Sequence, residues 1–181
     1  YKAGTIVSKN SPAYWDTTKE PTKTQYELFL KHDSFGEAEY RELCDYTHTK
    51  GMDFTSTPFD YASADYLEDM VDFYKISSSD LSNLPFIHHI GSKGKPVYIS
   101  VGAAYLSEVD VAIRVLKEAG CKDIVIFHCV LSYPTEPKNA NLRIIETLKK
   151  DFPDVRVGFS DHVAPDDTMM TLAVAYMLGA E

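Results

Sequence analysis

The sequence predicts an α/β fold of the TIM-barrel type, here an incomplete segment with about five parallel strands. Strand-like and helix-like segments alternate from residue 34 onward, and no Asn-Gly hairpin joins two strands, which favours parallel βαβ units. Every predicted strand also ends in polar side chains, and in a TIM barrel the carboxyl ends of all strands converge on one active site. An open doubly wound sheet would concentrate its ligands at one switch point, and the chain has no G-x-G-x-x-G motif.

The composition indicates a globular protein with an acidic surface. Among 181 residues, 27 acidic and 18 basic side chains give a formal net charge of −9, which disfavours nucleic acid and anionic membranes as partners. The longest apolar stretch, residues 169–178, is far shorter than the roughly 20 residues that a membrane-spanning helix needs. Cys44, Cys121 and Cys129 are an odd number without metal-type spacing, so we expect no disulfide framework and a cytoplasmic location.

The chain divides into an irregular opening and a regular remainder. Residues 1–33 are predicted to form an irregular loop region with short helical pieces, and residues 34–181 to form alternating α/β units. Strands are expected over residues 52–57, 71–76, 95–102, 123–128 and 155–162. Helices are expected over residues 34–51, 62–70, 83–91, 107–120, 141–150 and 166–178. Capping boxes at Ser34/Glu37 and Ser107/Asp110 are expected to begin two of these helices.

Lys75 is the leading candidate for binding an anion. It ends an apolar strand just before a run of serines, where a lysine can bind phosphate or carboxylate or act as a Schiff-base amine. A lysine whose head only reaches water is the alternative. Thr57, Ser78 and Ser100 also lie at strand ends and can complete a phosphate cradle, although a strand-end serine is often only a helix cap. Residues 91–95 resemble a phosphate loop but precede a strand instead of following one, so we exclude them.

Three other strand-end residues can contribute chemistry. His162 ends the last predicted strand, where a neutral imidazole can ligate a metal, unless it is simply solvated beside a capping Asp161. Asp80 can bind sugar hydroxyls or assist proton transfer, or it can cap a helix. The Tyr133 hydroxyl can meet a substrate. For His128, a core position in which its hydrogen bonds are satisfied is at least as plausible as a catalytic role.

Five strand-end motifs occur in the order and spacing of a known family. They are Gly-Met-Asp-Phe-Thr-Ser-Thr-Pro-Phe at 51–59, Tyr-Lys-Ile-Ser-Ser-Ser-Asp at 74–80, Gly-Lys-Pro-Val-Tyr-Ile-Ser-Val-Gly at 94–102, His-Cys with Tyr-Pro-Thr within 128–135, and Gly-Phe-Ser-Asp-His at 158–162. Together they resemble the sialic acid synthase (N-acetylneuraminate synthase) family. The resemblance covers residues 34–181 and the central part of that family's TIM-barrel domain.

The resemblance implies a reaction and a site. The family condenses phosphoenolpyruvate with N-acetylmannosamine or a related N-acylated amino sugar, with a divalent metal, Mn²⁺ or Mg²⁺, that polarises the sugar aldehyde. Phosphate leaves by C–O cleavage. The residues implied to hold phosphoenolpyruvate are Thr57, Lys75, Ser78, Ser100 and Ser160. By the same resemblance His162 is one metal ligand, Asp80 and Tyr133 face the sugar, and Lys75, Asp80 and His162 are catalytic. A homodimer is a further expectation.

The chain also departs from the family pattern. Asp80 stands where the family usually has Glu, and Leu131 stands where some members have an Asn that contacts substrate, so the acceptor sugar stays open. The family's second metal histidine and its C-terminal antifreeze-like domain have no counterpart within these residues, so we expect the segment alone to be neither a closed barrel nor active. Two alternatives remain: a Schiff-base aldolase that uses Lys75, and a non-catalytic remnant that binds a sugar or a protein partner.

Overall fold

The computed structural model describes all residues, 1–181, and consists of two compact units, Tyr1–Val71 and Asp72–Glu181, which are described in turn. The first unit contains four helices: α1 (Ala3–Ile6), α2 (Gln25–His32), α3 (Glu37–Thr49) and α4 (Tyr61–Leu67). Two of these lie within residues 1–33, in agreement with the short helical pieces predicted there. None of the helices of the chain is both long and apolar enough to cross a membrane.

The start of α3 corrects one prediction. The helix begins after Gly36, whose N–H donates to Glu39 Oε2 at 2.8 Å, so the predicted box at Ser34 and Glu37 is wrong by two residues. The two overlapping pairs have the same spacing, and the pattern alone does not distinguish them. The predicted end is confirmed, because Gly51 adopts a φ of 68°, which favours glycine.

The predicted strand over residues 52–57 is also wrong. This segment follows α3 as extended or irregular chain and pairs with no strand, and a strand is stable only through hydrogen bonds to a neighbour. Its apolar character is satisfied by burial instead, since Phe54 is 8% exposed. The helix that follows agrees with the sequence: Asp60 caps α4 by accepting from the Ser63 N–H at 2.7 Å.

The second unit is built on a parallel sheet. Its strands are β1 (Tyr74–Ile76), β2 (Val97–Ser100), β3 (Ile124–His128) and β4 (Arg156–Phe159), arranged in the order β1-β2-β3-β4. The remaining elements are η1 (Ser78–Asp80), α5 (Leu84–Gly91), α6 (Leu106–Glu118), η2 (Pro137–Asn139), α7 (Ile144–Asp151) and α8 (Met170–Met177). Four of the five predicted strands therefore form, each parallel to the next along the chain, and the predicted α/β class is confirmed.

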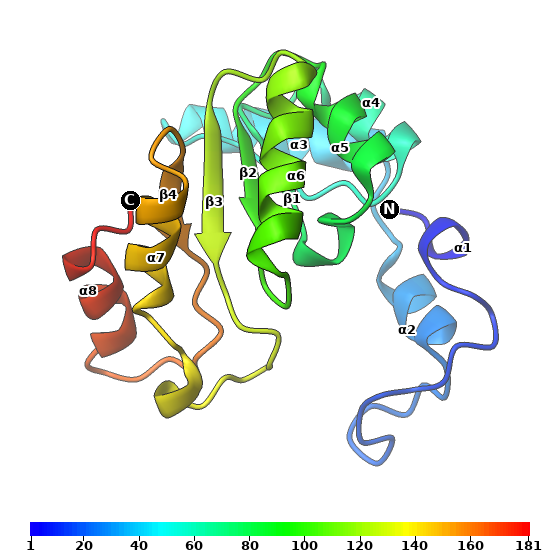
Figure 1. Cartoon of the computed structure of the whole chain (residues 1–181). Coiled ribbons are helices and arrows are strands. Elements are labelled where there is room, and N and C mark those ends of the chain that lie inside the picture. The colour runs from blue at the N-terminus through cyan, green and yellow to red at the C-terminus, as the bar shows by residue number, and fades with distance from the viewer. The chain divides into compact units, whose positions relative to one another are not determined.

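Helices cover one face of this sheet, with α6 beside β2 and α7 in front of β4 (Figure 1). The strand residues on that face include Tyr74, Ile76, Ile99 and Ile126, all fully buried. Because side chains alternate along a strand, the opposite face carries Phe73, Lys75, Tyr98, Ser100 and Phe127. On this second face the Phe73 and Tyr98 rings stack at 4.2 Å. The second face is the one that carries strand-end polar groups.

The helices of this unit confirm the apolar pattern and correct two boundaries. Val109, Ala112, Ile113 and Leu116 of α6 are buried as predicted. However, Glu108 accepts from the Tyr105 N–H at 2.8 Å, so the box predicted at Ser107 and Asp110 lies two residues too late, whereas the box predicted before α3 lies two residues too early. Helix α8 begins at Met170 instead of residue 166, because the Asp166 carboxylate accepts from the N–H groups of Thr168 and Met169 and forms a turn.

Candidate functional site

Lys75 and Ser100 meet at the carboxyl ends of neighbouring strands. Lys75 lies on β1 opposite Tyr98 of β2, and its Nζ reaches two residues further to donate to Ser100 Oγ at 2.6 Å. The same Nζ donates to the Ile76 carbonyl at 2.9 Å and lies 5.8 Å from the centre of the Phe127 ring. Burial lowers the pKa of Lys75, and the Cys129 thiol opposes that shift. A half-buried ammonium bonded to a buried hydroxyl does not agree with a lysine that only reaches water.

Ser78 forms a second polar cluster over the end of β2. Its Oγ accepts a hydrogen bond from the Gly102 N–H at 3.1 Å and lies 3.3 Å from Cys129 Sγ. Ser78 follows β1, Gly102 follows β2 and Cys129 follows β3, so the contacts join the ends of three consecutive strands. The sequence does not predict this contact. Its only signals are that Gly102 ends one predicted strand and that Cys129 directly follows the next.

Asp80 lies at the end of η1, two residues after Ser78. Burial raises the pKa of its carboxyl, and a hydrogen bond from Asn83 Nδ2 at 3.3 Å opposes that effect. Asp80 is therefore not the side-chain cap of α5, and the N-cap residue of that helix, Asn83, donates to Asp80 and forms no side-chain cap itself. A half-buried carboxylate of this kind can accept hydrogen bonds from an uncharged ligand such as a sugar.

The end of β4 brings His162, Ser160 and Tyr133 together. His162 Nδ1 is 2.5 Å from the Val130 carbonyl, which can only accept, so Nδ1 carries the proton and Nε2 has a free lone pair. Ser160 Oγ lies 3.4 Å from that Nε2. The Tyr133 ring packs on the His162 ring, with centroids 4.2 Å apart, while the Tyr133 side chain remains 72% exposed. This tautomer is the one in which a histidine acts as a metal ligand through Nε2.

The carboxylate beside His162 does not join it as a ligand. Asp161 accepts from the Val163 N–H at 2.8 Å and from the Thr171 hydroxyl at 2.6 Å, so both of its oxygens are engaged elsewhere. No group of three His, Cys, Asp or Glu side chains in the chain is placed to hold a metal ion. The one metal ligand that these residues suggest is therefore Nε2 of His162.

His128 is a satisfied core histidine. It is 3% exposed, its Nε2 lies 2.8 Å from the Ala140 carbonyl, and its ring stacks on Phe159. Burial lowers the pKa of His128, so the neutral form is favoured. Thr57 belongs to the first unit, where it is half-buried in the chain between α3 and α4.

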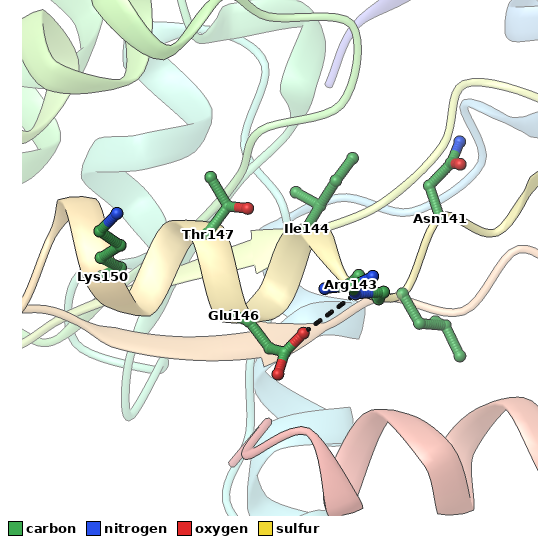
Figure 2. Close-up of a pocket in the computed structure, with 7 residues that line it drawn as sticks. Asn141, Arg143, Ile144, Glu146, Thr147 and Lys150 are labelled. Carbon is green, nitrogen blue, oxygen red and sulfur yellow. Dashed lines mark hydrogen bonds and ion pairs between the residues drawn. The ribbon is translucent and has the colours of Figure 1, made fainter.

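Two cavities of the second unit lie on the helix side of the sheet. One, of about 630 Å³, is lined by residues 141–144, Glu146, Thr147 and Lys150 along α7, and it contains none of the predicted site residues. Figure 2 shows that Arg143 and Glu146, which line it, pair with each other, at 3.4 Å. The other, of about 490 Å³, is lined mainly by apolar side chains and reaches Cys129 and Leu131. We therefore take the strand ends themselves as the candidate site.

Comparisons with known proteins place this chain in a family. The whole chain, residues 1–181, matches the sequence model of the NeuB family. An uncharacterized protein of Methanocaldococcus jannaschii is 40% identical over 160 residues, which are 88% of this chain and 46% of that protein. The N,N'-diacetyllegionaminic acid synthase of Legionella pneumophila is 34% identical over 169 residues, which are 90% of this chain and 47% of that enzyme. The chain thus spans about half the length of these curated relatives.

Solved structures show the same fold. A crystal structure of N-acetylneuraminic acid (sialic acid) synthetase from Leptospira borgpetersenii, in complex with citrate, superposes with a TM-score of 0.84 at 28% identity, covering 100% of this chain and 57% of that one. A truncated 3-deoxy-D-arabino-heptulosonate 7-phosphate synthase from Thermotoga maritima superposes with a TM-score of 0.69 at 16% identity, over 81% and 58% of the two chains, which supports the fold alone. With its strand-end motifs, its sheet and a family match along its whole length, the chain belongs to the NeuB family.

Proposed function

We propose that the protein containing this chain is a nonulosonic acid synthase. This transferase condenses phosphoenolpyruvate with N-acetylmannosamine or a related N-acylated amino sugar. The observation that carries the proposal is the bond between the Lys75 ammonium and the Ser100 hydroxyl at the ends of neighbouring strands. Membership of the NeuB family and the names of its relatives support the reaction class.

The proposed anion site uses one cation and several hydroxyl groups. Phosphoenolpyruvate carries a phosphate and a carboxylate, and charge-assisted hydrogen bonds from fixed donors are the strongest way to hold such groups. Lys75 supplies the charge, and Ser78, Ser100 and Ser160 of the same unit supply hydroxyl donors. For Thr57, which belongs to the first unit, a role as a further donor rests on the resemblance alone. On binding, the ammonium and the Ser100 hydroxyl exchange their mutual bond for bonds to the anion.

The proposed reaction forms one C–C bond and breaks one C–O bond. C3 of phosphoenolpyruvate attacks the aldehyde carbon of the sugar, and positive charge develops at C2. Water adds to C2 and gives one proton to the former aldehyde oxygen, which becomes a hydroxyl. The bond from C2 to the phosphate oxygen then breaks, and the proton of the new C2 hydroxyl leaves with the phosphate, which gives the keto acid and inorganic phosphate. Asp80 accepts hydrogen bonds from the sugar hydroxyls or assists proton transfer, and Tyr133 donates its hydroxyl to the sugar.

We propose that His162 supplies one ligand to a divalent metal, Mn²⁺ or Mg²⁺. Its protonated Nδ1 is held by the Val130 carbonyl, which leaves Nε2 available. The other ligands would come from substrate, water or other parts of the whole protein, because no group of three His, Cys, Asp or Glu side chains in this chain is placed to hold a metal ion. When bound, such a metal supplies Lewis-acid polarisation of the sugar aldehyde. Ligation at Nε2 also frees the Ser160 hydroxyl to donate to the anion.

The cleaved bond gives a direct test of the reaction. The whole protein is incubated with N-acetylmannosamine and phosphoenolpyruvate that carries ¹⁸O in the bridging oxygen, and the phosphate formed is analysed by mass spectrometry. C–O cleavage leaves the label in inorganic phosphate. Phosphate without the label, or no acceptor-dependent phosphate with any N-acylated amino sugar of a panel, would contradict the proposal.

A Schiff-base aldolase is the second candidate, and the lowered pKa of Lys75 favours it. A buried lysine with a lowered pKa has more of its neutral amine, which is the form that attacks a carbonyl. An aldolase of this kind forms a covalent imine with its keto substrate. Borohydride would then trap a stable adduct on Lys75, detectable by mass spectrometry of the peptide, whereas the synthase reaction leaves Lys75 unmodified.

Location and assembly complete the proposal. Cys44, Cys121 and Cys129 are all buried and form no disulfide bond with one another, which supports a reducing, cytoplasmic compartment. The homodimer that the resemblance implies is proposed with it. Light scattering of the whole protein gives the mass that tests the dimer.

A further inference from the structure

The Ser78 hydroxyl has an unusual set of partners for a group that must bind an anion. A serine hydroxyl has one proton to donate and two lone pairs to accept with. One lone pair accepts from the Gly102 N–H at 3.1 Å, and Cys129 Sγ lies 3.3 Å away on a different strand end. Both contacts come from backbone or side-chain groups that are buried or nearly so, since Cys129 is 5% exposed.

These partners decide where the hydroxyl proton can point. The Gly102 N–H is a donor only, so the Ser78 proton has two choices, the sulfur of Cys129 or an external acceptor. A thiol is a weak acceptor and also a weak donor. When a phosphate or carboxylate oxygen takes the Ser78 proton, the Cys129 S–H can donate to the second lone pair of Ser78, so the cluster remains satisfied in both states.

The close approach of Gly102 keeps the three groups in register. A Cβ at position 102 would lie 2.7 Å from Cys129 Sγ and 3.2 Å from Ser78 Oγ, so no larger residue fits without moving one of them. This crowding holds the sulfur and the hydroxyl against each other. Lys75 lies on β1 and Ser78 follows the same strand three residues later, so the cluster lies near the proposed cation.

We propose that Cys129 and Gly102 are positioning residues that orient the Ser78 hydroxyl as a proton donor to the anionic substrate. The inference rests on the proposed function, in which Ser78 contacts phosphoenolpyruvate. Cys129 acts only through Ser78 and touches no substrate. The thiol is therefore required for its hydrogen-bonding capacity, and its nucleophilicity plays no part.

A double-mutant cycle in the whole protein tests this directly. Cys129→Ala is expected to raise the KM for phosphoenolpyruvate about 3- to 10-fold, the range that one ordinary uncharged hydrogen bond gives, with a smaller change in kcat. In the Ser78→Ala background the same substitution is expected to add less than about twofold. A purely structural role would move KM and kcat equally in both backgrounds, and that result would overturn the proposal.

Two further variants keep the test decisive if Cys129→Ala folds poorly. Cys129→Ser retains a donor and an acceptor, so it is expected to keep the KM within about twofold of the wild type. If a folded Cys129→Ser variant lost as much affinity as Cys129→Ala, hydrogen bonding by the thiol would not be the reason. Gly102→Ala is expected to raise the same KM by at least as much as Cys129→Ala, because its methyl group displaces the sulfur or the hydroxyl.

Cys121, near the other end of β3, provides a matched control. Cys121 and Cys129 are both buried, free and adjacent to β3, but Cys121 lies before the strand and donates to the carbonyls of Lys95 and Asp123. Cys121→Ala is expected to leave the KM for phosphoenolpyruvate unchanged. If wild-type protein binds no phosphoenolpyruvate in a calorimetric titration, the proposed function fails and the inference with it. If the wild type binds and Cys129→Ala binds equally well, only the inference fails.

Discussion

At the scale of single residues, the candidate site depends on one half-buried lysine. The Lys75 ammonium has exchanged water for the Ser100 hydroxyl and the Ile76 carbonyl, and neither partner carries a formal charge. Because no carboxylate is among these contacts, the positive charge of Lys75 can still pair with an anionic ligand. Burial removes part of the hydration free energy of the Lys75 ammonium. Attraction to an anion bound at the strand ends would offset that cost.

Replacement of Lys75 tests this. We expect Lys75→Ala in the whole protein to weaken phosphoenolpyruvate binding by roughly 1.5–3 kcal/mol, which is about 10- to 150-fold, because one charge-assisted contact is lost. Lys75→Arg is expected to restore binding only in part, because the guanidinium is larger and planar. Calorimetric titration measures both, and unchanged binding in Lys75→Ala would show that the anion lies elsewhere.

The lowered pKa of Lys75 predicts the pH dependence. Its pKa lies below the ordinary lysine value of 10.5, so the ammonium loses its proton at a lower pH than a surface lysine does. Since the charged form binds the anion, kcat/KM for phosphoenolpyruvate should fall as pH rises through that pKa. The Lys75→Arg variant should lose this basic limb, because arginine stays protonated there. A basic limb with the same midpoint in Lys75→Arg would assign it to another group.

The metal-ligand role proposed for His162 predicts how the protein responds to removal of the metal. Chelation should abolish turnover, and Mn²⁺ or Mg²⁺ should restore it. His162→Ala should weaken metal affinity in a calorimetric titration of the metal alone, because one ligand is lost. His128→Ala is a control of the same residue type, since that imidazole is buried against the Ala140 carbonyl and should not alter metal affinity. Full turnover in chelator would contradict the metal role.

At the scale of elements, the sequence pattern predicts what burial determines and misses what pairing determines. The apolar stripe of α6 and the continuous apolar run of β3 were predictable because both are buried whatever their neighbours are. The strand at residues 52–57 was not, because a strand needs a partner that the pattern does not name. For the same reason Lys75 and Ser100 could be placed at strand ends, whereas the contact of Ser78 with Cys129 could not, since it depends on the order of β1, β2 and β3.

The packing of α5 against α6 predicts a stability effect. A Cβ on Gly91 would lie 2.9 Å from the Ala119 Cβ and 3.2 Å from Leu116 Cδ2, so Gly91→Ala overpacks this contact. The expected loss of unfolding free energy is about 1–3 kcal/mol, reduced by the roughly 1 kcal/mol that alanine gains in a helix. Denaturant unfolding measures it. Ala119→Gly in the same chain should recover part of the loss, and a variant as stable as wild type would show that the helices can separate at no cost.

At the scale of the whole molecule, the net charge of the chain and the share of its relatives that it spans both bear on the proposed function. A net charge of −9 repels a substrate with two anionic groups, so binding has to come from local donors such as Lys75 and Ser100. The chain superposes on a sialic acid synthetase over 57% of that enzyme and spans about half the length of its curated relatives. The proposed activity therefore belongs to the whole protein, while this chain contributes the proposed anion site.

A crystal structure of the whole protein with phosphoenolpyruvate shows whether this ligand binds at the carboxyl ends of β1 and β2. We predict an anionic oxygen of phosphoenolpyruvate within about 3 Å of Lys75 Nζ, with further oxygens accepting from the hydroxyls of Ser78 and Ser100. A ligand bound at another place, with Lys75 Nζ still bonded to Ser100 Oγ and the Ile76 carbonyl, would contradict the account.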